Sequence, residues 1–411
     1  MKQHKVNISR REFLINTGIT GAGFALGMSL PHNNKAFAAE TAAPNTTPEI
    51  NAWVVIEPDD TVIIRIARSE MGQGTLTGLA QLVAEELECD WSKVTTEYAS
   101  PAQNLARNKV WGSFATGGSR GIRTSHDYVR KGGAVAREML IQAAANEWGV
   151  PADECSAANS VITHKPGGRT TTYGKVASAA AKLEPPFDVI LKDPEDWTIA
   201  GKPVKRLDTK DKVTGKQVYG ADLKLPGMLN AAIKACPVFG GSVKSFDAKA
   251  IKQRPGVRKV VQVGDDAVAV VADTWWHAKS ALDALPIVWN EGPNANMSSA
   301  SIDTMLTEGL DSNDDVFTGN QSGDAKAALK RAAKTVEATY RYPYQAHACM
   351  EPMNATARWT RERCEVWCPT QNGESALQDT AKAAGLPAEQ CEVYKLHLGG
   401  GFGRRSIHDY I

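Results

Sequence analysis

Four glycines in five residues lie near the C-terminus, in the run 399–403 (Gly-Gly-Gly-Phe-Gly), and two arginines follow it. Glycine has no Cβ and adopts positive φ without strain, so such a run lets the backbone approach a bulky anion closely. The alternating stretch before the run is typical of a strand, which would fix where the glycine loop begins. We expect an anion-binding turn here, and the alternative is an ordinary tight turn.

A second glycine-rich segment, residues 70–77 (Glu-Met-Gly-Gln-Gly-Thr-Leu-Thr), contains Gln73 and Gly74. The β-branched stretch 61–67 before it predicts a strand. The stretch after it keeps the three-to-four spacing of a helix at Leu79, Leu82, Val83 and Leu87. A strand, glycine loop and helix in this order would point backbone N–H groups at the helix N-terminus toward an anion.

A third segment, residues 113–123, precedes a helical pattern over about 125–148 and carries two arginines. Its hydroxyl groups and open backbone are typical of a phosphate or pyrophosphate clamp. A Gly-Ser loop with solvated arginines is the alternative. Three such loops in one chain favour a common anionic ligand, and the candidate residues in this one are Thr116, Gly117, Gly118 and Ser119.

The overall charge argues against nucleic acid as a partner. The 411 residues have a formal charge of +1, and the first 38 contain five basic residues and one acidic residue. The remaining 42 basic and 45 acidic side chains leave no electropositive footprint. The seven cysteines show no C-x-x-C pair and no plant-type iron–sulfur spacing, so any iron–sulfur relay is expected on another chain.

Residues 1–38 predict a twin-arginine signal peptide. Residues 9–14 (Ser-Arg-Arg-Glu-Phe-Leu) carry the twin-arginine pattern, a glycine-rich apolar stretch follows over 15–30, and residues 36–38 form an A-x-A cleavage site. A membrane anchor is the alternative, but the apolar stretch is shorter than the roughly 20 residues that span a bilayer. We expect a periplasmic protein that is exported folded, with its cofactor inserted.

The rest of the chain predicts a multi-domain α+β protein. Its expected parts are a tether (39–50), a segment with two glycine loops (51–182), a proline-marked linker (183–205), a compact α+β module (206–292), a polar connecting region (293–331) and a last block that ends in the glycine run (332–411).

Thr370-Gln371 lies upstream of the glycine run, with 31 residues from Gln371 to Phe402. This pairing resembles the molybdopterin-binding subunit of the xanthine dehydrogenase/aldehyde oxidase family. The resemblance covers nearly all of the chain after the signal and is closest to the isoquinoline 1-oxidoreductase β-subunit branch, because two glycine loops precede the central module and because Gly-Phe-Gly is followed by Arg-Arg. It implies an α/β-hammerhead domain at 206–292, flanked by portions of molybdopterin-binding domains at 51–182 and, truncated, at 332–411.

The resemblance also implies a molybdenum–molybdopterin cofactor, with the cytosine dinucleotide form as one alternative. In the family, Gln371 hydrogen-bonds an oxygen ligand of molybdenum and the Phe402 N–H approaches the apical oxo group. The pterin dithiolene holds the metal, so no metal-ligating side chain is expected. The implied cofactor-binding residues are Gln73, Gly74, Thr116, Gly117, Gly118, Ser119, Gln371, Gly400, Gly401, Phe402, Gly403 and Arg404.

The implied reaction is hydroxylation of N-heteroaromatic compounds or oxidation of aldehydes, with water as the oxygen source. Ser406 stands where purine-oxidising members carry a glutamate, which argues against xanthine. A small [2Fe–2S] subunit is the implied partner, and a cytochrome c is a candidate electron acceptor. The family's catalytic glutamate lies in a Gly-x-Gly-Glu segment that does not occur up to Ile411, so no catalytic residue is expected here.

Two other functions compete with this one. A non-catalytic cofactor-binding or assembly protein is the alternative that the missing glutamate keeps open. A nicotinamide dehydrogenase is disfavoured, because G-x-G-x-x-G is broken at Arg404.

His347 and Glu351 are candidates for an acid/base pair, because imidazole and carboxylate exchange protons near neutral pH. The favoured interpretation is that both satisfy backbone groups beneath the site. Likewise Cys349, Cys364 and Cys368 are expected to be buried small residues rather than metal ligands.

Overall fold

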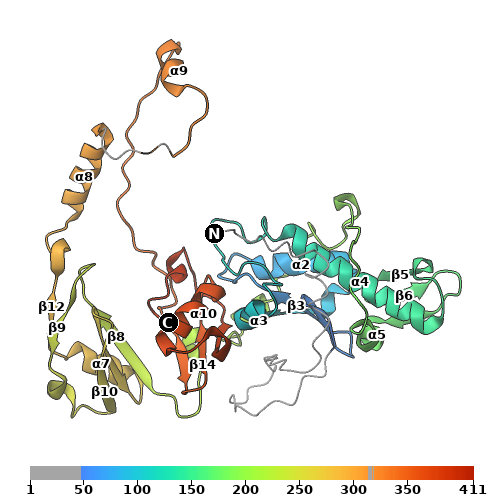
Figure 1. Cartoon of the computed structure of the whole chain (residues 1–411), viewed down its shortest axis with the longest axis horizontal. Coiled ribbons are helices and arrows are strands. Elements are labelled where there is room, and N and C mark those ends of the chain that lie inside the picture. Colours follow the sequence, from blue (N-terminus) through green and yellow to red (C-terminus); the bar gives the residue numbers. More distant parts are fainter. Residues whose placement is uncertain (1–47, 313–316, 318) are drawn as a thin grey trace, which may run out of the picture. The chain divides into compact units, whose positions relative to one another are not determined.

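The computed structural model describes residues 48–312, 317 and 319–411, and its contacts divide the chain into two units (Figure 1). The first unit joins the residues up to Leu223 with His347–Ile411, and the second is Lys224–Ala346. The signal peptide and most of the tether expected at the N-terminus lie outside the described residues. Several separate sheets and interspersed helices confirm the α+β, multi-domain class.

A four-stranded sheet forms the N-terminal part of the first unit. In pairing order its strands are β1 (Glu49–Asn51), β2 (Val54–Ile56), β3 (Val62–Ile66) and β4 (Val94–Tyr98). Neighbours are antiparallel except β3 and β4, which are parallel and therefore need a crossover. Helix α2 (Thr75–Leu87) makes it, which confirms the predicted strand, glycine loop and helix.

Helix α4 (His126–Trp148) packs on this part through two adjacent glycines. A Cβ on Gly133 would lie 2.4 Å from the Val83 carbonyl oxygen of α2, and a Cβ on Gly132 would lie 2.7 Å from the Trp53 ring. No side chain fits at either position, so glycine here serves close packing. The predicted helix over about 125–148 is confirmed. The other elements of this part are α3 (Pro101–Ala106), the antiparallel strands β5 (Cys155–Ala158), β6 (Val161–His164) and β7 (Thr170–Thr172), α5 (Tyr173–Ala180) and α6 (Thr209–Val213).

The C-terminal part of the first unit repeats the crossover arrangement. Strands β14 (Cys364–Cys368) and β15 (Cys391–Lys395) are parallel, helix α10 (Gly373–Ala384) connects them, and β13 (Thr356–Trp359) pairs antiparallel with β14. Cys364 and Cys368 are buried in its apolar core, as expected from the sequence. Because β14 and β15 run parallel, the segments after their carboxyl ends leave the sheet at one edge, where ligands bind in many α/β folds.

The second unit has its own small core around β11 (Ala267–Ala272), which lies between β10 (Val257–Val263) and β8 (Asn230–Ala235). Its other elements are the paired strands β9 (Ser242–Phe246) and β12 (Ile287–Asn290), and helices α7 (Trp275–Asp283), α8 (Ser299–Asp311) and α9 (Ala325–Arg331). Contacts place residues 206–223 with the first unit and 332–346 with the second. The domain boundaries implied by the family resemblance stay a prediction.

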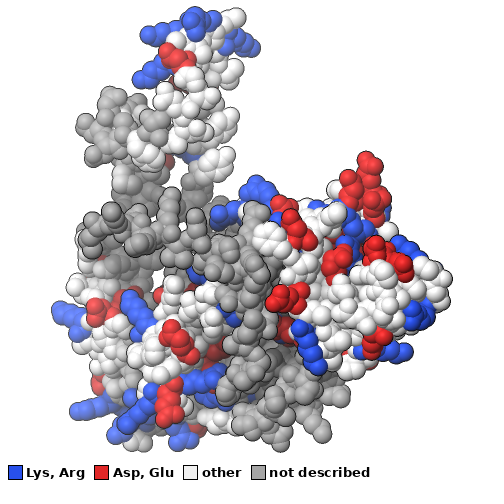
Figure 2. Space-filling model, turned by 45° about the vertical axis from the view of Figure 1, so that its right-hand side comes forward, with Lys and Arg blue, Asp and Glu red and all other residues white. Residues whose placement is uncertain are grey.

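Charged side chains of both signs are interspersed over the face in Figure 2, and Lys and Arg gather around α9 at its top. Within the described ranges, no helix combines the length and the apolar character needed to cross a membrane.

Candidate functional site

Four loops that are far apart in the sequence meet in the first unit. They are the Glu70 loop (residues 68–74, after β3), the Thr116 loop (115–125, before α4), the Gln371 loop (369–372, after β14) and the glycine loop (398–405, after β15). Ser69 joins the first three, because its N–H donates to Thr116 Oγ1 (2.9 Å) and its Oγ to the Thr370 carbonyl (2.7 Å). The Leu398 N–H donates to the Glu70 carbonyl (3.0 Å) and adds the fourth.

Gln371 is the central residue of this arrangement and is only 3% exposed. Its Nε2 donates to the Thr116 carbonyl (2.8 Å), and its Oε1 accepts from the Gly403 N–H (2.9 Å). Its backbone N–H donates to the Arg405 carbonyl (3.0 Å), and its carbonyl accepts from the Thr116 N–H (2.7 Å). An amide nitrogen carries two hydrogens, and the structure gives Nε2 this one acceptor among the described residues, so one donor remains for a ligand.

The glycine loop passes so close to Gln371 that only glycine fits at position 401. A Cβ on Gly401 would lie 2.7 Å from Gln371 Oε1 and 2.7 Å from Met71 Sδ. The positive φ angles belong to its neighbours Gly400 (96°), Phe402 (53°) and Gly403 (91°). Gly401 is therefore required for close approach rather than for its φ.

Phe402 holds a left-handed backbone conformation although it is not glycine. Such a conformation costs about 1–2 kcal/mol and is common at functional sites. Its side chain is 70% exposed, so the ring does not bury apolar area that would offset this cost.

A buried ion pair supports the glycine loop. Arg405 is fully buried and lies 3.0 Å from Glu351 Oε2. Arg405 Nε donates to the Gly400 carbonyl (2.9 Å), and the Glu351 carboxylate accepts from the N–H groups of Gly399 (2.9 Å) and Gly220 (3.1 Å). The interpretation of Glu351 as a structural group is confirmed. The same interpretation is wrong for His347, which is exposed and hydrogen-bonds no described residue.

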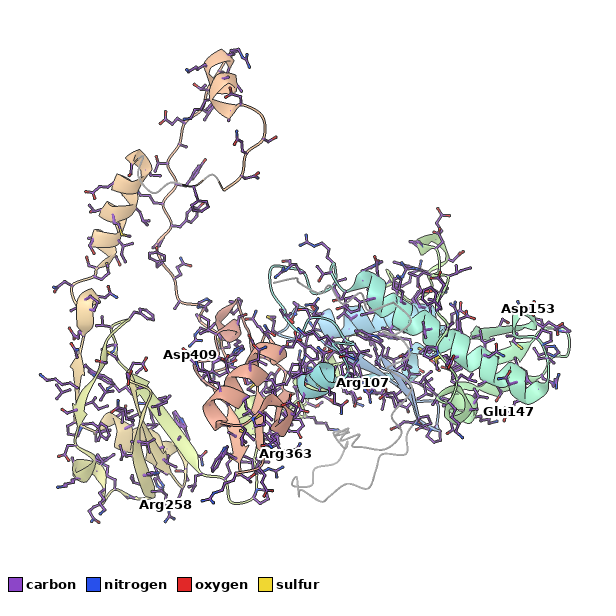
Figure 3. The ribbon with its side chains drawn as sticks, in the orientation of Figure 1. Arg107, Glu147, Asp153, Arg258, Arg363 and Asp409 are labelled. Atoms are coloured by element: carbon purple, nitrogen blue, oxygen red, sulfur yellow. The ribbon has the colours of Figure 1, made fainter. Side chains whose placement is uncertain are left out.

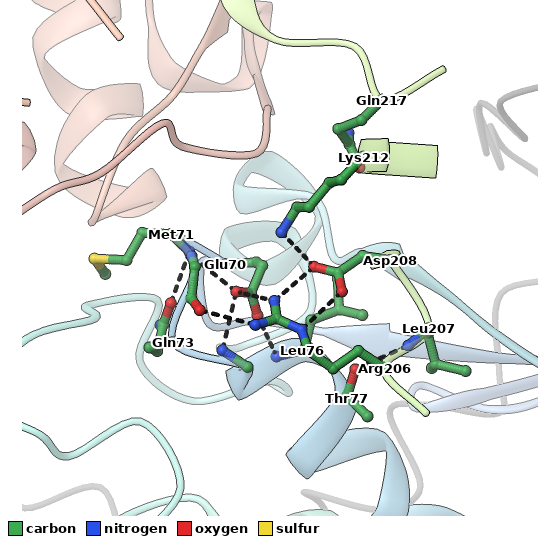
Figure 4. A network of polar contacts seen from close by, with 12 residues as sticks. Glu70, Met71, Gln73, Leu76, Thr77, Arg206, Leu207, Asp208, Lys212 and Gln217 are labelled. Carbon is green, nitrogen blue, oxygen red and sulfur yellow. Dashed lines mark hydrogen bonds and ion pairs between the residues drawn. The ribbon is translucent and has the colours of Figure 1, made fainter. Parts of the chain in front are cut away.

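The Glu70 loop differs from the sequence prediction, because its N–H groups face a side chain of the chain itself (Figure 4). The buried Glu70 carboxylate accepts from the N–H groups of Gly72 (2.9 Å), Gly74 (3.0 Å) and Leu76 (3.0 Å). Arg206 Nη2 donates to the same carboxylate (2.9 Å) and its Nη1 to the Gly72 carbonyl (2.8 Å). Glu70 thus occupies the anion position at the α2 N-terminus, and the prediction of an external anion there is wrong.

The predicted site residues of the Glu70 loop shape it from within. Gln73 Oε1 accepts from the Met71 N–H (2.7 Å), its Nε2 donates to the Ser69 carbonyl (2.9 Å), and Gly74 supplies a φ of 86° before α2. Figure 4 shows that Arg206 extends the network to Asp208, which also receives Lys212 Nζ (2.5 Å). Burial alone would raise the pKa of Asp208, but the hydrogen bonds from both cations lower it to about 2.

The Thr116 loop leaves its backbone donors open. Thr116 is buried, whereas Gly117, Gly118 and Ser119 are exposed and their N–H groups find no acceptor in the part of the chain that the structure describes. Ser119 has a φ of 55°. This loop, unlike the Glu70 loop, can offer N–H groups to a ligand.

Arg404, the last predicted site residue, is paired with Asp409, which Figure 3 labels. Both guanidinium nitrogens Nη1 and Nη2 donate to the carboxylate at 2.9 Å. The structure therefore places Arg404 near the end of the glycine loop with its charge already compensated.

Sequence reasoning missed Ser69 and Arg206, and it left Glu70 and Arg68 without a role. Ser69 and Glu70 directly precede the glycine pattern, so their position was a usable signal. Arg206 lies 136 residues from Glu70 at the edge of an expected linker, and nothing local indicates its partner. No group of three or more His, Cys, Asp or Glu able to hold a metal occurs in the described ranges.

A family described as molybdopterin cofactor-binding domain matches residues 5–221, slightly more than half of the chain, and a second family with this description matches residues 310–411. The chain belongs to the molybdopterin cofactor-binding domain family. The resemblance to molybdopterin-binding subunits of the xanthine dehydrogenase/aldehyde oxidase family is thereby confirmed.

Two relatives of this family member align along nearly its whole length. The membrane-bound aldehyde dehydrogenase [pyrroloquinoline-quinone] of Gluconacetobacter polyoxogenes is 29% identical over 100% of this chain and 54% of its own length. The isoquinoline 1-oxidoreductase subunit beta of Brevundimonas diminuta is 29% identical over 97% of this chain and 56% of its own. Among solved structures, the aldehyde oxidoreductase from Desulfovibrio gigas is 23% identical, with a TM-score of 0.41, over 57% of this chain and 31% of its own. The chain spans about half the length of the curated relatives it matches.

Proposed function

We propose that this chain is the molybdopterin-binding part of a molybdenum hydroxylase that hydroxylates N-heteroaromatic compounds or oxidises aldehydes with water as the oxygen source. The observation that carries the proposal is the contact of Gln371, Met71 and Gly401, where three loops meet without room for a Cβ. The names of two relatives, an aldehyde dehydrogenase and an isoquinoline 1-oxidoreductase, support the substrate class.

The residues present fit a large anionic pterin. A Cβ on Gly72, Gly117 or Gly403 would meet no atom within 4 Å, so the backbone is open at three of the four loops. Gln371 keeps one amide donor, and the Thr116 loop keeps three backbone donors. A bound molybdenum–molybdopterin would supply the two-electron oxidation. Its cytosine dinucleotide form is one candidate for the bound cofactor.

The roles of the chain's own residues follow from their geometry. Gln371 would orient a polar group of the cofactor with its remaining amide hydrogen, held in place by Thr116 and Gly403. The Phe402 N–H would donate to the same part of the cofactor. A preorganised donor stabilises charge most where water is excluded. Five other predicted residues would act by shaping the loop backbone around the cofactor: Gln73, Gly74, Gly400, Gly401 and Gly403. Arg404 would contact the cofactor at the rim of the site.

The test is the cofactor content and turnover of the protein purified together with a small [2Fe–2S] subunit. We expect about one molybdenum and one pterin per chain, and reduction of an acceptor such as cytochrome c with an aldehyde or an N-heteroaromatic compound. Because Ser406 replaces an acidic purine contact, xanthine should be a poor substrate. Absence of pterin from the folded protein would contradict the proposal.

A cofactor-binding or assembly role without turnover is the second candidate, because the site residues described above act through backbone shape and hydrogen-bond donors rather than as an acid or a base. This role predicts full pterin content and transfer of the cofactor to another protein, with no turnover when the iron–sulfur subunit is added.

Export through the twin-arginine pathway belongs to the same proposal. Changing Arg10 and Arg11 to Lys should leave the precursor in the cytoplasm. An unchanged periplasmic yield would remove the targeting claim while leaving the cofactor claim intact.

A further inference from the structure

Two basic side chains are buried next to the Thr116 loop without a carboxylate partner. Arg68 is 5% exposed and Lys395 is 6% exposed. Neither forms an ion pair with a residue of the described ranges; Lys395 Nζ instead donates to the Ala67 carbonyl (2.5 Å) and lies 4.7 Å from the centre of the Phe114 ring. A buried charge that no opposite charge compensates costs several kcal/mol, so its presence needs an explanation.

Arg68 holds the two ends of the Thr116 loop together. Its Nη1 donates to the Ala115 carbonyl at the start of the loop. Its Nη2 donates to Thr124 Oγ1 and its Nε to Ser125 Oγ, both at 3.0 Å, at the end of the loop. The planar guanidinium fork can bind three acceptors at once, which an ammonium on a flexible stem cannot do in this geometry.

The outer side of the same loop is also positive. Arg120 and Arg123 are exposed, and neither forms an ion pair with any residue that the structure describes. Gly121 and Ile122 rest on α2, since a Cβ on Gly121 would lie 3.3 Å from Thr75 Cγ2 and a Cβ on Gly78 3.0 Å from Ile122 Cδ1. Unlike the Glu70 loop, this loop combines free N–H groups and cations with no internal anion.

Of these two buried basic residues, Arg68 rather than Lys395 supplies the permanent positive charge. Burial, followed by the charge of Arg68, lowers the pKa of Lys395 well below its ordinary value. A guanidinium keeps its proton in proteins.

We propose that Arg68 is a positioning residue that holds the Thr116 loop closed around a phosphate or pyrophosphate group. That this group belongs to the bound cofactor rests on the proposed function. The N–H groups of Gly117, Gly118 and Ser119, with Arg120 and Arg123, would contact the anion, and Arg68 acts through the loop.

Tryptic cleavage after Arg120 and Arg123 measures the state of this loop without any enzyme activity. The probe is inorganic pyrophosphate, added to the purified protein. In the wild type we expect pyrophosphate to slow cleavage at both sites, while cleavage after the exposed Lys249 of the second unit stays unchanged. Arg68→Gln should cleave faster and need about tenfold more pyrophosphate for the same protection, which corresponds to the loss of about one charge-assisted contact.

Arg68→Lys separates positioning from charge. It keeps the charge but not the three-way fork, so it should behave like Arg68→Gln. Arg107→Gln is the matched control. It removes a partly buried arginine, and the partner of that arginine, Glu49, keeps its other ion pair with Arg65. Wild-type protection in Arg68→Lys would show that the charge alone acts, and wild-type protection in Arg68→Gln would show that Arg68 does not position the loop; either result overturns the inference.

A milder variant covers the case in which Arg68→Gln does not fold. Thr124→Val changes an exposed residue and removes one hydrogen-bond acceptor of Arg68. It should weaken the protection by pyrophosphate against trypsin about threefold. Unchanged protection would contradict the inference. If pyrophosphate protects a protein that never contains pterin, the inference about Arg68 stands and the proposed function fails. If Arg68→Gln has the pterin content of the wild type, the proposed function stands and the inference about Arg68 fails.

Discussion

The Glu70 loop and the Thr116 loop have the same sequence signature, glycines and polar residues ahead of a helix, but opposite electrostatics. In the first, a buried carboxylate accepts from Gly72, Gly74 and Leu76. In the second, Arg68 closes the loop and the N–H groups of Gly117–Ser119 stay open. A glycine loop is an anion site only when the chain does not supply the anion.

Removing the internal anion should have the largest effect. Glu70→Gln keeps the side-chain shape but removes one of the two carboxylates that pair with Arg206, leaving Asp208, and faces three N–H groups with a neutral amide. We expect a loss of about 3–5 kcal/mol in the free energy of unfolding, measured with urea, because three N–H groups and one guanidinium lose a buried charged acceptor together.

Glu138→Gln is the matched control, since its pair with Arg137 is 45% exposed on the carboxylate side and should contribute less than about 1 kcal/mol. Equal stability of Glu70→Gln and the wild type would mean that Glu70 does not act as the internal anion.

The pH dependence of the free energy of unfolding tests the surroundings of Glu70 through His397. Burial lowers the pKa of His397 to about 4, and Lys212, Asp208, Glu70 and Arg206 face it. The unfolded chain takes up the proton below about pH 6.5, whereas the folded chain does so only near pH 4. Stability is therefore full above about pH 6.5 and falls by about 3 kcal/mol as the pH drops to about 4.

His397→Gln should flatten this part of the profile, when urea unfolding is compared at pH 7.5 and 4.5. Identical slopes in the variant and the wild type would show that His397 is not the titrating group. Losses common to both proteins come from other groups and do not bear on it.

Gly401→Ala tests the meeting point of the loops. The added Cβ would lie 2.7 Å from both Gln371 Oε1 and Met71 Sδ, so the loops must separate. Overpacking of this kind costs about 1–3 kcal/mol, and pterin content should fall with it. Gly309→Ala in α8 is the control, because its Cβ meets nothing within 4 Å. Full pterin content in Gly401→Ala would contradict the cofactor assignment.

Arg404→Gln should have the smallest effect on stability. Its pair with Asp409 is 27% and 57% exposed, which is worth less than about 1 kcal/mol. Pterin content should fall if Arg404 also contacts the cofactor, and Asp409→Asn, which frees the guanidinium, should not reduce it. Unchanged pterin content in Arg404→Gln would remove Arg404 from the site.

Several parts of this site could be predicted from the sequence. The β-branched stretch before Glu70 and the periodic helix after it gave β3 and α2, since local propensity and tertiary packing agree there. That Gln371 and the glycine loop lie together came from the family resemblance and is borne out by the parallel pairing of β14 and β15.

Other parts depend on partners that no local pattern contains. The Glu70–Arg206 pair spans 136 residues, and the Arg68 fork spans up to 57. Whether backbone donors are free or occupied is decided by such distant side chains, so spacing alone predicted the Glu70 loop wrongly. The left-handed Phe402 also opposes its local preference, as expected where the surrounding loops over-determine the backbone.

Hydrogen–deuterium exchange of individual amides, with and without bound cofactor, tests the contrast between the two loops most directly. The amides of Gly72, Gly74 and Leu76 should be protected in both states, because Glu70 accepts from them. Those of Gly117, Gly118 and Ser119 should exchange rapidly without cofactor and become protected with it. Protection gained on cofactor binding in the Glu70 loop, and not in the Thr116 loop, would contradict the account.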